Sequence, residues 1–370
     1  MYFNLKYLLF GIFLLIATSE FTFGQWNLTV STLQEYSDNP FHSPFAEESF
    51  ISTLNFGVEK SFDYFSAAYH GNYTNFANLT DRNYYWHQLG FWNTTNNFMY
   101  GINIEQRLNG ENFNFYNYLN YSGYLRYRFN INNTYIFGNT SINVTDYSEL
   151  NDLDNLFGSI SLNANKSFKS KTTLIGGTTL KYKNYFNTEL NSLENNVNIV
   201  ANSNSAFTSQ LTYYVKIAQS ITPTTGLALQ YTGRNIIAGT AKTIRKLQFA
   251  YGDESKYFDD PISYEGYTGN IQLSQILPWE IILRTSYFFN SKVYPSQGAY
   301  IKIDYLNTDT KRKDTQQIFN FGMQKKIYFG KTENNSLILL LNYQYINNSS
   351  NSYWYNYEVN KINLGISYNF

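Results

Sequence analysis

Few residues in this chain have the type and spacing that acid–base or metal chemistry needs. There are 3 histidines, His42, His70 and His87, and there is no cysteine. None of the histidines has a partner at metal-ligand spacing, and zinc sites are built mainly from His and Cys, so we expect no bound metal. A hydrolytic pair on a strand would place His and Ser two residues apart on one face, but Ser43 directly follows His42 and Pro44 comes next. We therefore predict no catalytic residue and no cofactor. We expect His70 and His87 to lie at an interface with lipid or on the wall of a lumen.

A short acidic segment offers oxygen atoms of the kind that bind Ca²⁺. It holds Asp152, Asp154 and Asn155. The ligand spacing of an EF-hand loop is absent, however. We interpret the segment as a solvated loop.

Basic residues recur on the polar sides of segments in which polar and apolar residues alternate. The candidates of greatest interest are Arg107, Arg126, Arg128, Lys216, Arg234 and Lys302. Others on polar faces are Lys181, Lys183, Arg284, Lys326 and Lys361, against fewer acids: Glu59, Glu105, Glu280 and Asp304. If these faces line a pore, an excess of Arg and Lys favours anions. Alternatively, the bases pair with nearby acids or extend to lipid phosphates.

The segments that carry these charges alternate with a period of two, which is the side-chain period of a β-strand. The clearest are 98–105, 124–131, 159–165, 210–217, 227–232, 301–305 and 362–370. Weaker ones are 50–59, 64–73, 84–92, 135–145, 172–183, 264–275, 280–289, 316–329 and 336–346. Many approach the roughly 9–11 residues of a tilted membrane strand, and no stretch has a sustained helical period.

The connections between these segments favour antiparallel strands. We expect the 6 prolines to lie in turns and loops, since proline cannot donate to a strand ladder. They are Pro40, Pro44, Pro223, Pro261, Pro278 and Pro295. Short connections such as 60–63 and 132–134 contrast with long polar ones such as 146–155 and 184–205. We predict about 16 strands, within about 14–18, and two further candidates at 26–32 and 242–251 would raise the count to about 18.

The composition also limits the classes of protein to which the chain can belong. Basic and acidic residues balance at 27 each, so nothing indicates nucleic-acid binding. Aromatic residues reach 19%, with 36 Tyr and 30 Phe, although the mean hydropathy is −0.40. Large amphipathic rings in a chain that is polar on average suit a barrel with a lipid-facing outer surface and a polar inner one.

The N-terminal residues 1–24 have the pattern of a cleaved secretory signal peptide. Lys6 precedes an apolar run over 7–17, and Thr22 and Gly24 supply small residues before Gln25. The run is shorter than the roughly 20 residues that a membrane-spanning helix needs. Residues 25–48 follow as a segment that holds a possible first strand and a loop, or a small plug around 39–45, and we favour the loop. We assign 49–370 to the barrel.

The C-terminal segment alternates apolar and polar residues up to Phe370. Tyr368 and Phe370 end its apolar face. With the features above, the whole chain resembles an outer-membrane β-barrel of a diderm bacterium, and the Asn- and Tyr-rich composition resembles that of Bacteroidota proteins. The resemblance implies an all-β, transmembrane, antiparallel up-and-down β-barrel, in which Tyr368 and Phe370 form the insertion signal. It also implies outer-membrane lipids and the barrel-assembly machinery as partners.

Three functions are compatible with such a barrel. The first is a passive, porin-like pore for small hydrophilic solutes, with an anion preference from the basic residues. The second is a non-conducting accessory barrel in protein secretion or surface lipoprotein export, which implies a protein partner. The third, an outer-membrane enzyme that modifies lipids, is disfavoured by the scarcity of acid–base residues.

Overall fold

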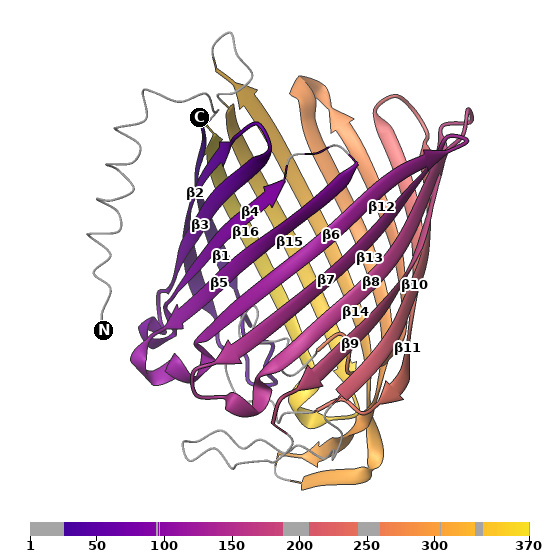
Figure 1. Cartoon of the computed structure of the whole chain (residues 1–370). Coiled ribbons are helices and arrows are strands. Elements are labelled where there is room, and N and C mark those ends of the chain that lie inside the picture. Colours follow the sequence, from indigo (N-terminus) through magenta and orange to yellow (C-terminus); the bar gives the residue numbers. More distant parts are fainter. Residues whose placement is uncertain are drawn as a thin grey trace.

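Sixteen antiparallel strands form a closed barrel (Figure 1), as the alternation predicted. The computed structural model describes residues 26–93, 95, 97–187, 207–242, 260–303, 305–329 and 336–369. Each strand pairs with its neighbours in the sequence, and β1 closes the barrel against β16. The strands are β1 (Trp26–Ser37), β2 (Ser49–Ser61), β3 (Phe65–Phe76), β4 (Tyr84–Asn93), β5 (Phe98–Asn109), β6 (Tyr118–Ile131), β7 (Thr134–Tyr147), β8 (Asn155–Ser167), β9 (Thr172–Tyr185), β10 (Phe207–Ser220), β11 (Thr225–Gly239), β12 (Glu265–Leu277), β13 (Ile281–Lys302), β14 (Tyr305–Tyr328), β15 (Ser336–Ser350) and β16 (Tyr357–Asn369).

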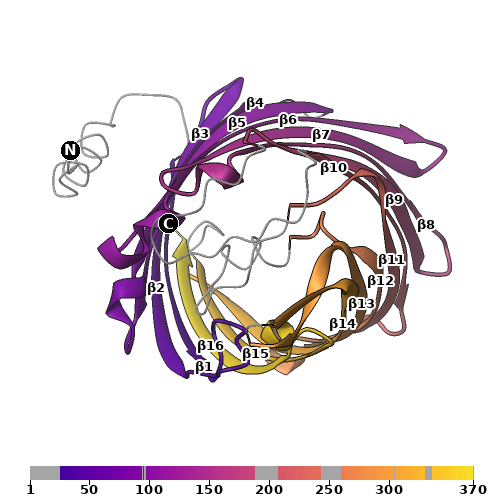
Figure 2. The same cartoon turned by 90° about the horizontal axis from the view of Figure 1, so that it is seen from below.

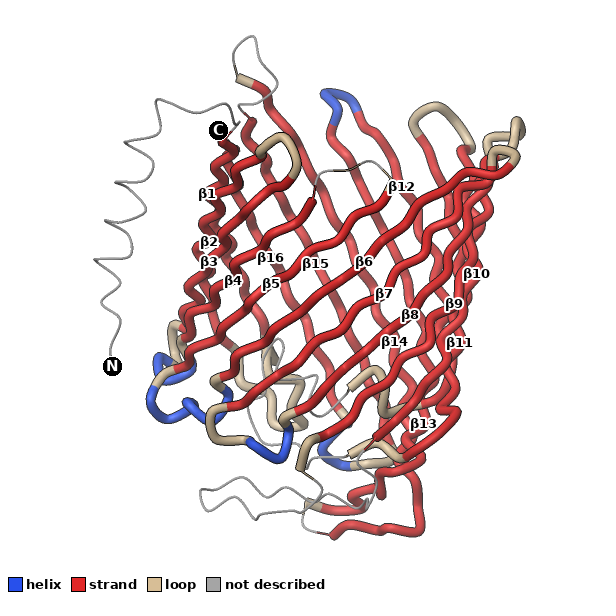
Figure 3. The backbone as a smooth tube through the Cα atoms, in the orientation of Figure 1, coloured by secondary structure: helices blue, strands red, loops and turns tan. Residues whose placement is uncertain are grey.

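The two ends of the barrel differ in their connections (Figure 3). At one end, which we call the short-turn end, β6 and β7 are joined by Asn132 and Asn133 alone. Both have positive φ, 47° and 61°, as a tight two-residue hairpin turn requires. The other end, which we call the loop end, carries the short helices η1 (Thr80–Arg82), η2 (Glu111–Tyr116), η3 (Asn151–Leu153) and η6 (Tyr353–Tyr355).

The outer face of the barrel is apolar because successive side chains in a strand point to opposite sides. Ile102 is 58% exposed and Leu364 57%, although both are large and apolar. The period of two predicts that the apolar side chains of the clearest alternating segments share one face and meet lipid, and the structure places these residues on the outer face: Phe98, Tyr100, Ile102, Ile104, Leu125, Tyr127, Phe129, Leu211, Tyr213, Val215, Leu364 and Ile366. No helix in the described residues is long and apolar enough to cross a membrane.

The predicted strand at 301–305 was wrong, although the total near sixteen was right. Ile301 and Lys302 end β13, and Tyr305 begins β14, so this segment is the tip of one long hairpin. The missing strand is supplied by Trp26–Ser37, which was only an optional candidate. The segment 301–305 alternates because it continues two strands beyond the barrel wall, and a local pattern carries no information about where a strand crosses a membrane.

The sequence predicted that Pro295 lies in a turn or loop, but it lies within β13. It sits where the pairing of β13 with β14 shifts register, between Tyr294 and Gly298. A shifted register leaves some backbone N–H groups without a ladder partner, so proline is tolerated there. Residues 1–24, which are predicted to be a signal peptide, lie outside the described residues, as do residues 243–251 and Phe370.

Aromatic side chains fill the loop end between the connections. One buried cluster brings together Tyr116, Tyr147, Leu153, Tyr300 and Trp354, which come from distant parts of the chain. A second packs Phe41 against Ile51 and Phe76. These clusters hold the connections against one another at the rim. The view from below shows the strands arranged as a closed ring (Figure 2).

Candidate functional site

The interior wall of the barrel is the candidate functional site, and antiparallel pairing arranges its side chains in rows. In one row Ser286, Asn320, Gln344 and Lys361 are successive partners on β13, β14, β15 and β16. Asn320 donates to Ser286 and accepts from Gln344, at 3.3 and 2.7 Å. Such amide and hydroxyl ladders make the wall polar while satisfying its hydrogen-bonding groups.

Arg126 and Arg128 lie together on the interior face of β6, near the short-turn end. Both are exposed. The Arg126 guanidinium lies 4.7 Å from the ring centre of Tyr124, and its Nε donates to Asn139 Oδ1 at 3.3 Å. No ion pair involves either arginine among the described residues. Their positive charges therefore face the interior without a neutralising carboxylate.

Lys216 and Arg234 lie on the interior face of the neighbouring strands β10 and β11. Arg234 Nη1 donates to Thr268 Oγ1 at 3.0 Å, and its guanidinium lies 5.4 Å from the ring of Tyr264. The Nε of Arg234 is buried and has no partner within the described part of the chain. Lys216 is half-buried among neutral residues of the same wall.

The other two predicted charges do not join this group. Arg107 faces inward but is only 3% exposed; it lies 3.9 Å from the ring of Tyr84, and its Nε donates to Asn109 at 3.1 Å. This packing makes Arg107 part of the wall. Lys302 is exposed at the tip of the β13–β14 hairpin, beyond the barrel wall, because the predicted strand there does not exist.

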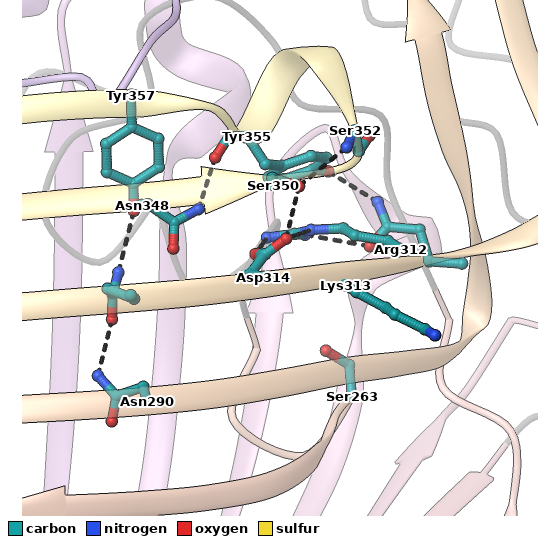
Figure 4. Close-up of polar contacts among 12 residues, drawn as sticks. Ser263, Asn290, Arg312, Lys313, Asp314, Asn348, Ser350, Ser352, Tyr355 and Tyr357 are labelled. Carbon is teal, nitrogen blue, oxygen red and sulfur yellow. Dashed lines mark hydrogen bonds and ion pairs between the residues drawn. The ribbon is translucent and has the colours of Figure 1, made fainter.

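Arg312 and Asp314 form a buried ion pair at the loop end that was not predicted from the sequence (Figure 4). The side chain of Arg312 is 1% exposed and that of Asp314 is 0%. Arg312 Nε donates to Asp314 Oδ1 at 3.0 Å, and Nη1 donates to Gln297 Oε1 at 3.1 Å. Ser350 donates to the same carboxylate at 2.6 Å. The only available signal was the i, i+2 spacing, which places both residues on one face of a strand.

Two tyrosines enclose the Arg312 guanidinium. The ring centres of Tyr294 and Tyr355 lie 3.9 and 3.2 Å from it. Gln297 donates to the Tyr355 hydroxyl at 2.8 Å, and the Tyr300 amide donates to Ser352 at 3.0 Å. This group of contacts, which we call the hairpin latch, ties the β13–β14 hairpin to the connection between β15 and β16.

The acidic segment 152–155 is more ordered than a solvated loop. Asp154 Oδ1 accepts the backbone N–H of Tyr147 at 2.7 Å, and the Asp152 carbonyl accepts the ammonium of Lys242. Burial raises the pKa of Asp154 above its ordinary value, and burial lowers the pKa of Lys242. Within the described residues, no group of three or more His, Asp or Glu side chains could hold a metal ion.

The three histidines are separated. His42 stacks on Tyr357 with ring centres 5.1 Å apart, in the connection after β1. His70 points inward on β3, where its ring lies against Gly57. His87 points outward on β4 and is hydrogen-bonded to the Tyr69 hydroxyl at 2.6 Å. The structure does not bring these three rings to one site.

Comparison with known proteins supports the fold but does not assign the chain to a protein family. No protein-family model matches the chain, and no curated protein matches its sequence. Solved structures match over nearly the whole length. The outer-membrane protein opdK from Pseudomonas aeruginosa is 8% identical with a TM-score of 0.52, covering 94% of this chain and 98% of that one.

Two further structures give similar values. Acinetobacter baumannii OccAB1 is 10% identical with a TM-score of 0.50, and the match covers 94% of this chain and 96% of OccAB1. A bacterial polysaccharide outer membrane secretin is 8% identical with a TM-score of 0.50, over 93% of this chain and 98% of that one. At such identities the likeness is one of fold: the chain is an all-β, closed, sixteen-stranded antiparallel barrel that resembles outer-membrane proteins.

Proposed function

We propose that this protein is a passive pore for small hydrophilic solutes in the outer membrane of a diderm bacterium. The observation that carries the proposal is the closed barrel with an apolar outer face and a polar interior wall. Barrels of this size leave an aqueous channel, and a polar lumen lets hydrated solutes pass where lipid does not. The fold resemblance to outer-membrane channels supports this proposal. A Bacteroidota origin stays a prediction from composition.

We further propose that the pore prefers anions. The interior face carries Arg126, Arg128 and Lys216 without a carboxylate partner, while Lys361 is 3.6 Å from the buried Glu35. Opposite charges attract more strongly along a wall of low dielectric constant than in bulk water. Unpaired interior bases therefore raise the local concentration of anions.

Replacing Arg126 and Arg128 together with Gln is expected to move the reversal potential in a salt gradient toward cation permeation. The change removes two positive charges from the interior and keeps polar side chains on the wall. Purified protein in planar bilayers provides the measurement. The matched control is the pair Lys166→Gln and Lys325→Gln, which removes two charges from the outer face near the same end. An equal shift in the control, or none in the interior variant, would contradict the anion preference.

A folded barrel that conducts nothing would favour the second function, an accessory barrel in protein secretion or lipoprotein export. One observation supports that alternative. At the tip of the β13–β14 hairpin, Ile301, Ile303 and Tyr305 are 48%, 41% and 59% exposed beyond the barrel wall. Exposed apolar side chains in such a position suit contact with a protein partner.

We also propose that residues 1–24 direct export and that the barrel-assembly machinery recognises the last strand. β16 pairs with β1 and β15, and its outward-facing Tyr368 packs against Phe329 with ring centres 6.2 Å apart. The last strand therefore carries an outward aromatic residue where it reaches the short-turn end.

Changing Phe370 to Asp is expected to leave export intact and to lower the amount of protein in the outer membrane. A charged residue replaces the last aromatic side chain of the apolar face, on which we expect recognition to depend. Membrane fractionation measures the yield, and Asn369→Asp on the opposite face is the control. An unchanged outer-membrane yield in the Phe370 variant would refute the terminal signal.

A further inference from the structure

A recess in the interior wall lies on the side of the barrel formed by β5 to β9, toward the loop end. It has a volume of about 360 Å³, and its lining includes Asn120, Asn143, Thr145, Phe157 and Glu105. Small-molecule sites in proteins commonly occupy about 300–1,000 Å³. The recess is therefore large enough for a small solute.

Strand pairing brings these side chains together. Glu105, Asn120, Thr145 and Asn155 are successive partners in one row across β5 to β8. The next row toward the short-turn end places Asn143 beside Phe157. The side chains come from separate strands, so the recess exists only in the closed barrel.

The charges around the recess are satisfied within the protein. The Lys183 ammonium is 2.5 Å from the Asp260 carboxylate, and both side chains are largely buried, at 17% and 16% exposed. The Tyr118 hydroxyl donates to Glu105 Oε1 at 2.6 Å. An anionic ligand would find no unpaired base here, because Lys183 is already paired with Asp260, and the Glu105 carboxylate would repel it. The recess therefore suits a ligand without negative charge.

Amide and carboxylate groups in the recess remain available to a ligand. Asn143 makes no side-chain hydrogen bond with any described residue, and Asn120 accepts from Thr145 at 3.2 Å, which leaves its amide N–H groups to donate. Glu105 keeps its second oxygen as an acceptor. Donors and acceptors that alternate along one wall match vicinal hydroxyl groups, which both donate and accept.

Phe157 supplies an apolar surface in this polar setting. Its side chain is half-buried on the interior face of β8, next in its row to Asn143 and Lys183. The face of an aromatic ring is electron-rich and attracts the weakly positive C–H groups of an apolar ring face. A ligand with one C–H face and a rim of hydroxyl groups fits both features of the recess.

We propose that this recess is a binding subsite for a neutral pyranose sugar, whose ring stacks on Phe157 while its hydroxyl groups bind Asn120, Asn143 and Glu105. The proposal rests on the pore function above and names a class of solute for it. Asn120 lies toward the loop end of β6, whereas Arg126 and Arg128 lie toward the short-turn end of the same strand and Lys216 lies on β10. The sugar site and the unpaired bases therefore use different residues, and the two properties are separable by mutation.

Maltose binding to the folded full-length protein in detergent, measured by calorimetry, tests the site without requiring conduction. We expect saturable binding, and we expect Phe157→Ala to weaken it roughly tenfold through loss of the stacking surface. Asn143→Leu is expected to weaken it as well. The control is Phe137→Ala, which removes an interior aromatic residue outside the recess on β7. The acyclic polyol mannitol, which has no ring face, is expected not to bind.

The outcomes separate this inference from the pore function. Conduction without saturable maltose binding would overturn the sugar site and leave the pore. Equal weakening by Phe157→Ala and Phe137→Ala, or equal binding of mannitol and maltose, would also overturn it. If Phe157→Ala does not fold, saturable maltose binding that is weakened by Asn143→Leu would still support the site. The same result in a barrel that does not conduct would support the sugar site independently of the pore function.

Discussion

Replacing Arg312 with Met is expected to destabilise the folded barrel by about 3–5 kcal/mol, because it leaves the Asp314 carboxylate buried without its partner. Asp314 has a side-chain exposure of 0%, so water cannot substitute for the guanidinium. The same change removes the contacts of Arg312 with Tyr294 and Tyr355. The free energy of unfolding from lipid vesicles, measured by urea titration, gives the comparison.

Two further variants separate the ion pair from a general effect on β14. Lys313→Met changes an exposed base next to Arg312 and is expected to leave stability nearly unchanged. Arg312→Met combined with Asp314→Leu removes both charges and is expected to recover much of the loss. A double variant no more stable than Arg312→Met, or a loss below 1 kcal/mol in Arg312→Met, would show that the latch is not held by its ion pair.

The hairpin latch has a consequence for the proposed pore. It joins β13 and β14 to the connection after β15, so it holds the long hairpin in one position at the loop end. Exposed hairpins without such contacts sample many conformations and narrow or widen the opening as they move. Under the proposed function, loss of the latch should therefore also increase current fluctuations.

Ile102→Lys is expected to cost about 2–4 kcal/mol of folding free energy in lipid, whereas Asn103→Lys costs little. Ile102 lies near the middle of β5 and is 58% exposed on the outer face. An ammonium there would be transferred from water to hydrocarbon. Asn103 is the next residue and points to the interior, where its amide donates to Ser122 at 3.4 Å.

Folding of each variant into lipid vesicles in urea measures this difference. The two substitutions introduce the same side chain on adjacent residues, so each serves as the control for the other. Equal costs would refute the assignment of the outer face, and a larger cost for Asn103→Lys would reverse it.

The sequence by itself determined the class of fold and the facing of its strands. The surroundings of a barrel strand differ between its two faces, so every strand repeats the same period of two, and a local pattern is enough to detect it. For this reason Ile102, Leu125 and Leu364 were assigned correctly to the outer face. Arg126 and Arg128 could be placed on one face of β6 for the same reason.

Only the tertiary structure decided where the strands end and which side chains meet. Ile301–Tyr305 alternates as a membrane strand does, yet it is a hairpin tip, because alternation reports the face of a residue and not its position along the barrel axis. The latch joins Arg312 to Tyr355, and the recess joins Asn120 to Phe157. Such neighbours follow from the pairing register of successive strands, which is set by backbone hydrogen bonds and turn lengths and by closure of β1 on β16. Closure is a condition on the whole chain, so no single segment of the sequence encodes it.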